Sequence, residues 1–148
     1  MYGDRNIALE IRYLSNTIKR DLASMVLNGI DGNLSEMQGL IIGYVGMYSK
    51  DKQISNKDIE KEFNLRKSTV SELLTNMEQN GLIRRETVEN DARVRRIELT
   101  EKAKTVNRII EKNIKEYELS LAKEFDEDEM KMFFAFIDRL KKSTMEID

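Results

Sequence analysis

The feature that most constrains the fold is a change of periodicity in the middle of the chain. Before it, apolar residues recur at helical spacing, whereas residues 83–88 and 93–99 are rich in β-branched residues. The tetrad between them, Glu89-Asn90-Asp91-Ala92, is composed of residues that favour turns. We therefore predict one β-hairpin within an otherwise helical protein.

Capping signals place four helices before this hairpin. The first covers residues 7–28, the second begins after Ser35, the third begins after Ser55 and the fourth covers residues 67–80. Each of the two serines is followed three residues later by Gln or Asp, which is the pattern of a capping box. The fourth helix has apolar residues at the spacing of one buried face: Val70, Leu73, Leu74 and Met77.

Two helices are predicted after the hairpin. Thr100 can cap a long helix with a nearly heptad apolar stripe, and residues 126–129 form a capping box for the last helix. The order α-α-α-α-β-β-α-α predicts a mainly α protein, a winged helix-turn-helix with helical dimerisation extensions. We treat residues 1–148 as one unit, in which residues 34–100 are the winged lobe and residues 1–30 and 101–148 are the helical dimerisation region.

The composition excludes several classes of function. The chain has no cysteine and no histidine, so disulfides, thiol redox chemistry and the usual zinc or haem ligand sets cannot form. The commonest general base is also missing, and we expect neither an enzyme nor a cofactor or metal. No apolar run is long enough for a membrane helix and the N-terminus does not look like a signal peptide, which predicts a soluble, cytoplasmic protein.

Positive charge is concentrated in the predicted hairpin. The chain as a whole has a net charge of −2, but from Arg84 to Arg96 there are five arginines and three acids. Guanidinium groups on a protruding hairpin suit the narrow, negative minor groove of DNA. The alternatives are an ordinary charged hairpin and, for the polar face of the fourth helix, a solvated surface without a partner.

Four segments together resemble the MarR/SlyA family of transcription regulators. They are Leu65-Arg66-Lys67-Ser68-Thr69-Val70-Ser71, Gly81-Leu82-Ile83-Arg84-Arg85, Asp91-Ala92-Arg93 and Leu99-Thr100-Glu101-Lys102-Ala103. The resemblance covers nearly the whole chain. It departs from the family pattern at Arg66, where a small capping residue is common, and in a wing without Gly or Pro.

The resemblance implies a set of DNA-binding residues. Arg93 would be the wing arginine that enters the minor groove, and Asp91 would hold it in place. The second helix of the motif would lie in the major groove, where base edges are readable. The full predicted set is Ser55, Asn56, Arg66, Lys67, Ser68, Thr69, Ser71, Thr75, Asn76, Arg84, Asp91, Arg93 and Arg95.

The resemblance also implies a homodimer and a small effector. The expected dimer surface consists of apolar residues of the terminal helices, namely Ile7, Ile11, Leu14, Phe125, Phe133, Phe134, Ile137 and Leu140. An amphipathic or phenolic effector would lie among Tyr13, Met25, Tyr44, Met47 and Tyr48. The alternatives are a monomer whose terminal helices fold back on their own core, and aromatic and Met residues that belong to that core.

The alternatives to a DNA-binding protein are an enzyme and a winged helix that binds protein. An enzyme would have to work with Asp, Glu, Lys, Ser or Tyr, and the acidic run at residues 126–129 is better explained by the positive end of a helix. A winged helix that binds protein instead of DNA is the second class. We predict a repressor that reads a pseudo-palindromic site in double-stranded DNA.

Overall fold

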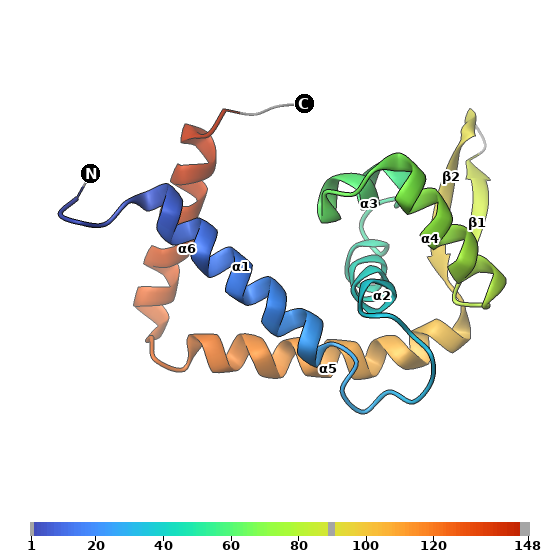
Figure 1. Cartoon of the computed structure of the whole chain (residues 1–148), viewed down its shortest axis with the longest axis horizontal. Helices are drawn as coiled ribbons and strands as arrows, with labels where there is room; N and C mark the ends of the chain where they lie inside the picture. Colours follow the sequence, from blue (N-terminus) through green and yellow to red (C-terminus); the bar gives the residue numbers. More distant parts are fainter. Residues whose placement is uncertain (1, 89–90, 146–148) are drawn as a thin grey trace. The chain divides into compact units, whose positions relative to one another are not determined.

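The computed structural model describes residues 2–88 and 91–145, and within them it describes no side chains at residues 88 and 91–94. Six helices and two strands follow one another in this part of the chain (Figure 1): α1 Ile7–Met25, α2 Glu36–Tyr48, α3 Asn56–Phe63, α4 Lys67–Gln79, β1 Ile83–Val88, β2 Asp91–Leu99, α5 Glu101–Ala122 and α6 Glu127–Ser143. The chain divides into two compact units, one ending at Ile114 and the other beginning at Lys115.

This order confirms the predicted mainly α fold class with a β-hairpin wing. Two boundaries differ from the prediction. The helix α1 ends at Met25, three residues early, where the side chain of Asn113 donates hydrogen bonds to the carbonyls of Val26 and Asn28. The strand β2 begins at Asp91, so two residues assigned to the turn by sequence pair with β1 or extend the strand.

The predicted caps form as expected. The Ser35 hydroxyl accepts from the backbone N–H of Gln38 at 3.1 Å, and the Gln38 side chain accepts from the backbone of Ser35. Asp126 caps α6 in the same reciprocal way. At the end of α3, Asn64 adopts a left-handed conformation with φ 50°, which turns the chain directly into α4.

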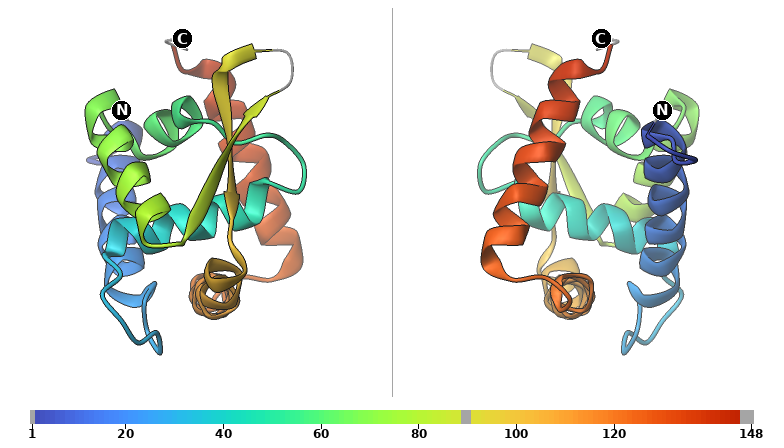
Figure 2. Two further views of the ribbon diagram at one scale, coloured as in Figure 1. Left: turned by 90° about the vertical axis from the view of Figure 1, so that its right-hand side faces the viewer. Right: turned by 90° about the vertical axis from the view of Figure 1, so that its left-hand side faces the viewer.

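The core of the first unit is formed where α2, α4 and the hairpin meet. Ile42 of α2, Leu74 of α4 and Ile97 of β2 are all fully buried. Figure 2 shows β2 crossing over α2, and α4 packs against β1. This packing leaves only one face of α4 exposed, and that face therefore determines what the lobe can present to a partner.

The two strands form an antiparallel hairpin whose register is regular from Ile83 to Thr87 and shifts between Thr87 and Val88. Ile83 pairs with Leu99 and Arg85 with Ile97, so apolar residues of both strands share the core face. The backbone N–H of Ile97 also donates to the carbonyl of Ile54 at 2.8 Å, which joins the segment before α3 to the edge of β2. The hairpin is thus attached to the lobe through both its face and its edge.

The helices α1 and α6 bury no residue in this single chain. Both are nevertheless amphipathic, because their apolar residues recur at helical spacing. No helix in the described residues has the length and apolar character needed to cross a membrane.

Candidate nucleic-acid interface

The exposed face of α4 carries the short polar side chains predicted to meet DNA. Val70, Leu74 and Met77 anchor the opposite face in the core, each with no exposed surface. Because helical neighbours on one face recur every three or four residues, burial of this stripe turns the other positions outward. All the predicted residues of α4 and the one before it are exposed: Arg66, Lys67, Ser68, Thr69, Ser71, Thr75 and Asn76.

These exposed residues differ in whether their polar groups are already engaged. Among the described residues, Lys67, Ser68, Thr69 and Ser71 make no side-chain hydrogen bond or ion pair. By contrast, the Asn76 side-chain oxygen accepts from both Gln38 and Asn80 at 2.9 Å. The N-terminal half of α4 is therefore the part whose side chains are available to a partner.

The backbone of α4 begins without a side-chain cap. Arg66 occupies the N-cap position, where the sequence departs from the family pattern, and makes no capping hydrogen bond among the described residues. The first backbone N–H groups of α4 are consequently not satisfied by this side chain, and helix N-termini of this kind bind anions such as phosphate.

The start of α3 is only partly exposed. Ser55 and Asn56 are half-buried. The Ser55 hydroxyl donates to the carboxylate of Asp58 at 3.1 Å, and the Ser55 backbone N–H donates to the same oxygen at 2.8 Å. The Ser55 hydroxyl therefore already serves the helix cap, and its role as a phosphate contact stays a prediction.

Arg85 is one of the hairpin arginines, and it faces α4 instead of solvent. Its side chain is 11% exposed, and its guanidinium lies 3.3 Å from the Glu78 carboxylate, with the Thr75 hydroxyl also at 3.3 Å. The hydrogen bond from Arg85 is the main reason why the pKa of Glu78 lies below its ordinary value. Arg85 thus holds the hairpin against α4, a structural role that the count of hairpin charges did not distinguish.

The other hairpin arginines of the described part point to different roles. Arg84 and Arg95 are exposed and form no ion pair among the described residues, although the Arg95 guanidinium donates a hydrogen bond to the backbone carbonyl of Arg85 at 3.4 Å. Arg96 pairs with Glu86 at 2.8 Å and with Glu98 at 3.0 Å, and its pKa is raised chiefly by the hydrogen bond to Glu86. Arg84 and Arg95, both predicted from the sequence, are therefore available to bind an anion, whereas Arg96 is already paired.

The two predicted wing-tip residues are Asp91 and Arg93. Both belong to β2 by their backbone, but their side chains lie outside the described residues. Their roles in DNA binding stay predictions.

The residues predicted for an effector fall into a ring cluster and two separate positions. Tyr44 and Tyr48 have ring centroids 4.9 Å apart, and Phe63 lies edge-on to Tyr44 at 5.9 Å. Met47 follows on the exposed side of α2, while Tyr13 and Met25 lie on α1. The effector site stays a prediction.

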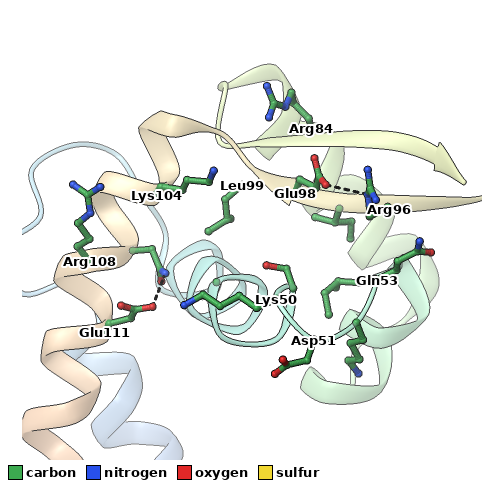
Figure 3. Close-up of a pocket in the computed structure, with 16 residues that line it drawn as sticks. Lys50, Asp51, Gln53, Arg84, Arg96, Glu98, Leu99, Lys104, Arg108 and Glu111 are labelled. Atoms are coloured by element: carbon green, nitrogen blue, oxygen red, sulfur yellow. Dashed lines mark hydrogen bonds and ion pairs between the residues drawn. The ribbon is translucent and has the colours of Figure 1, made fainter.

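Sequence reasoning missed a cleft on the edge of β2 (Figure 3). The buried Asn107 of α5 lies in its wall, against Gly46 of α2. A polar residue four positions after Ala103, on the apolar stripe of α5, is the sequence signal that could have drawn attention to this place. No group of three or more acidic side chains in the described residues could hold a metal ion.

Comparisons with known proteins agree with this geometry. The model of the MarR family matches residues 49–94, the segment from the end of α2 into β2. The structure of a MepR–DNA complex from S. aureus is similar over 95% of this chain and 99% of that one, with 25% identity and a TM-score of 0.73. The chain resembles MarR-family transcription regulators in both sequence and fold.

Two further MarR-type structures support the same resemblance. A transcription regulator MarR from Oenococcus oeni PSU-1 shares the fold over 93% of this chain and 99% of that one, with 23% identity and a TM-score of 0.68. S. aureus MepR bound to ethidium bromide is similar over 95% and 98% of the two chains, with 26% identity and a TM-score of 0.54. The search of curated proteins gave no match.

The elements that carry the predicted surfaces all lie within the part of the chain that these comparisons cover. The family match covers α3, α4 and the start of the hairpin, the elements that carry the predicted DNA-binding residues. The structural likeness extends beyond them to α1, α5 and α6. Two of the similar structures, MarR from Oenococcus oeni PSU-1 and S. aureus MepR, are those of transcription regulators.

Proposed function

We propose that this protein is a sequence-specific DNA-binding repressor that acts as a homodimer and responds to a small ligand. The observation that carries the proposal is the exposed, unpaired N-terminal half of α4, beside a hairpin with exposed Arg84 and Arg95. The chain is also similar in fold to S. aureus MepR, whose structure is that of a complex with DNA.

In this proposal α4 enters the major groove. The hydroxyl groups of Ser68, Thr69 and Ser71 are short, so they bond base edges or phosphates only when the helix lies close to the DNA. Lys67, at the start of the helix, contributes a positive charge beside backbone N–H groups that favour phosphate. Side chains thus read the sequence while the helix end fixes the position on the backbone.

The wing supplies a second, less sequence-dependent contact. Arg84 and Arg95 contribute planar guanidinium groups, whose geometry matches the oxygens of a phosphate. Arg93 would extend this contact into the minor groove, with Asp91 holding it, as the resemblance implies. Such contacts respond to groove shape and phosphate charge.

The apolar faces of α1 and α6 support the homodimer. Ile11, Leu14 and Phe134 are 45%, 55% and 55% exposed in the single chain. Large apolar residues gathered on exposed helix faces mark interaction surfaces, and a two-fold dimer would cover the same faces on both copies. Ile137 and Leu140 are half-buried within their own unit and contribute to the same predicted surface.

The ring cluster of α2 and α3 supports a ligand-responsive regulator. Tyr44, Tyr48 and Phe63 lie within ring-contact distance, and the Lys52 ammonium lies 5.9 Å from both tyrosine rings. An amphipathic aromatic ligand would stack among such rings. A ligand that binds only the DNA-free protein would lower DNA affinity by linkage.

Selection of bound duplexes from a random DNA pool tests the DNA-binding proposal. We expect enrichment of a pseudo-palindrome with half-sites about one helical turn apart, and binding to the selected duplex that weakens as salt rises. Ser68→Ala should change the preferred bases more than the salt dependence, because a hydroxyl carries no charge. Binding with no sequence preference, or no binding to any duplex, would contradict the proposal and favour a protein-binding winged helix.

The ligand part needs a separate measurement. Ethidium is a suitable first probe because a similar structure contains it, followed by phenolic compounds. A ligand that raises the melting temperature and releases the selected duplex supports the proposal. Tyr44→Ala should weaken both responses, whereas Tyr2→Ala serves as the exposed tyrosine control. Failure of every probe to shift the melting temperature would contradict ligand sensing without affecting DNA binding.

A further inference from the structure

A cleft of about 700 Å³ opens beside the edge of β2 in the first unit. Its walls are the end of α2 with the loop that follows, the strand β2, and the N-terminal half of α5 (Figure 3). It contains none of the predicted effector residues and none of the exposed residues of α4, although it shares Arg84 with the predicted DNA-binding set. Clefts of this volume commonly hold small molecules.

The cleft is strongly basic in a chain of net charge −2. Three acids and six basic residues line it, the latter being Lys50, Lys52, Arg84, Arg96, Lys104 and Arg108. A concave surface with an excess of one charge attracts small ions of the opposite sign. The cleft therefore favours an anionic ligand.

Three of these cations form no ion pair among the described residues, namely Lys50, Arg84 and Arg108. Arg84 already belongs to the predicted DNA-binding set, whereas Lys50 and Arg108 lie at the walls formed by the end of α2 and by α5. Within the described part of the chain, Lys50 and Arg108 form no hydrogen bond or ion pair. Lys50 extends from the end of α2 toward α5, which carries Arg108 (Figure 3). By contrast, Arg96 is already paired with Glu86 and Glu98. Lys50 and Arg108 are thus the residues best suited to hold an anionic group.

Asn107 provides an independent reason to expect a ligand. It lies between these two walls and is only 7% exposed. Its side-chain nitrogen donates to Glu111 at 3.1 Å, but its side-chain oxygen is buried and accepts no hydrogen bond from any described residue. A buried acceptor without a donor costs roughly 1–3 kcal/mol, so such groups call for a specific explanation.

The local sequence makes room for this asparagine. A Cβ at Gly46 would collide with the Asn107 side-chain nitrogen and would come within 2.9 Å of the oxygen. Only glycine therefore lets α2 approach α5 closely enough to enclose the amide beside the cleft. A ligand with a hydroxyl or amine group would supply the donor that the Asn107 oxygen lacks.

We propose that this cleft binds a small organic anion that also carries a hydrogen-bond donor. Lys50 and Arg108 bind its carboxylate or phosphate group, and the Asn107 oxygen accepts a hydrogen bond from its hydroxyl or amine. A phosphate of the DNA backbone is the competing occupant. The concave shape and the buried acceptor favour a small molecule, because a backbone phosphate at neutral pH has no proton to donate.

Calorimetric titration of the full chain with matched pairs of small molecules tests the proposal. Citrate and tricarballylate differ by one hydroxyl, and glucose 6-phosphate and glucose differ by the phosphate. We expect citrate or glucose 6-phosphate to bind, and glucose not to bind. Citrate should bind about fivefold more tightly than tricarballylate, the usual contribution of one hydrogen bond. No binding of any anionic probe at millimolar concentration would overturn the proposal.

Single substitutions test whether the anion binds in this cleft. Arg108→Gln and Lys50→Gln should each weaken anion binding about tenfold or more. Lys112→Gln is the control, because it removes the same charge from an exposed position of α5 that does not line the cleft. Equal losses in all three variants would show a general charge effect and overturn the proposal.

Two further outcomes decide between the occupants. Weaker duplex binding by Arg108→Gln, with unchanged citrate binding, would assign the cleft to DNA and overturn the proposal. Equal affinities for citrate and tricarballylate would overturn the hydrogen bond to Asn107. The direct titration contains no DNA, so its failure leaves the proposed DNA-binding function intact.

Discussion

The helices α4 and α6 are both amphipathic, yet they end up in opposite environments. In α4 the apolar stripe is fully buried, with Val70, Leu74 and Met77 showing no exposed surface. In α6 no residue is buried, and Phe133 and Phe134 are 47% and 55% exposed. Periodicity therefore predicts a helix and its apolar face, but not whether the surface that covers this face belongs to the same chain.

We expect the largest loss of stability from a substitution in the buried stripe of α4. Leu74→Ala should lower the free energy of unfolding by roughly 2–5 kcal/mol, because it leaves a cavity in a filled core. Denaturant unfolding measures this loss. Glu72→Ala, on the exposed face of the same helix, is the control. If both variants unfold alike, the burial assigned to α4 is wrong.

The matching change on α6 should act on association instead of folding. Phe134→Glu places a charge on the apolar face, and an aromatic anchor contributes about 2 kcal/mol or more to an interface. Analytical ultracentrifugation should show a weaker dimer with helical content preserved. Lys131→Glu reverses a charge on the same exposed helix and is the control. A wild-type chain that is monomeric at micromolar concentration would contradict the dimer.

A third change tests how closely α2 packs. Gly46→Ala should destabilise the protein by about 1–3 kcal/mol, because its Cβ collides with Asn107. Met47→Ala, one residue on and 52% exposed, should have little effect on thermal unfolding of the same chain. A Gly46→Ala variant as stable as the parent would mean that α2 and α5 do not approach so closely.

Substitutions in the wing should weaken DNA binding and leave folding unaffected. Arg93→Ala should lower DNA affinity and reduce the slope of log affinity against log salt by roughly 1 for each lost phosphate contact. Asp91→Ala should cause a smaller loss, since it releases the arginine without removing it. Binding by fluorescence anisotropy at several salt concentrations measures both. Parent-like binding by Arg93→Ala would exclude the wing as a DNA contact.

The smallest expected effect is a pH dependence at the contact between α4 and the hairpin. Arg85 lowers the pKa of Glu78 in the folded state. This pair therefore stabilises the protein at pH values above the pKa of glutamate in the unfolded chain, which is about 4.3. The stabilisation is lost as pH falls through the lower, folded pKa. Glu78 is 37% exposed, so solvent screening limits the effect to less than about 1 kcal/mol. Glu78→Gln should remove this acid-dependent part of the unfolding free energy, and an unchanged profile would contradict the pairing.

The sequence predicts most of the fold because its signals are local. Caps such as Ser35 with Gln38 use contacts only three residues apart, and the stripe of α4 follows from helical spacing alone. The early end of α1 could not be predicted, because Asn113 lies far along the chain from Val26 and Asn28. Non-local hydrogen bonds of this kind leave no periodic pattern.

The candidate site was predictable in part for the same reason. Exposure of Ser68 and Ser71 follows from burial of the opposite stripe. The separate roles of Arg84 and Arg85 depend on which face of the hairpin meets α4, and a count of charges does not contain that information. The Asn107 cleft requires α2, β2 and α5 to come together, so it becomes visible only in three dimensions.

We propose that two copies of this chain present their α4 helices to one DNA site. Native mass spectrometry of the protein with its selected duplex tests this directly. We expect a complex of two chains with one duplex, and no complex of the same mass with a scrambled duplex. One chain per duplex, or equal occupancy of the scrambled duplex, would contradict it.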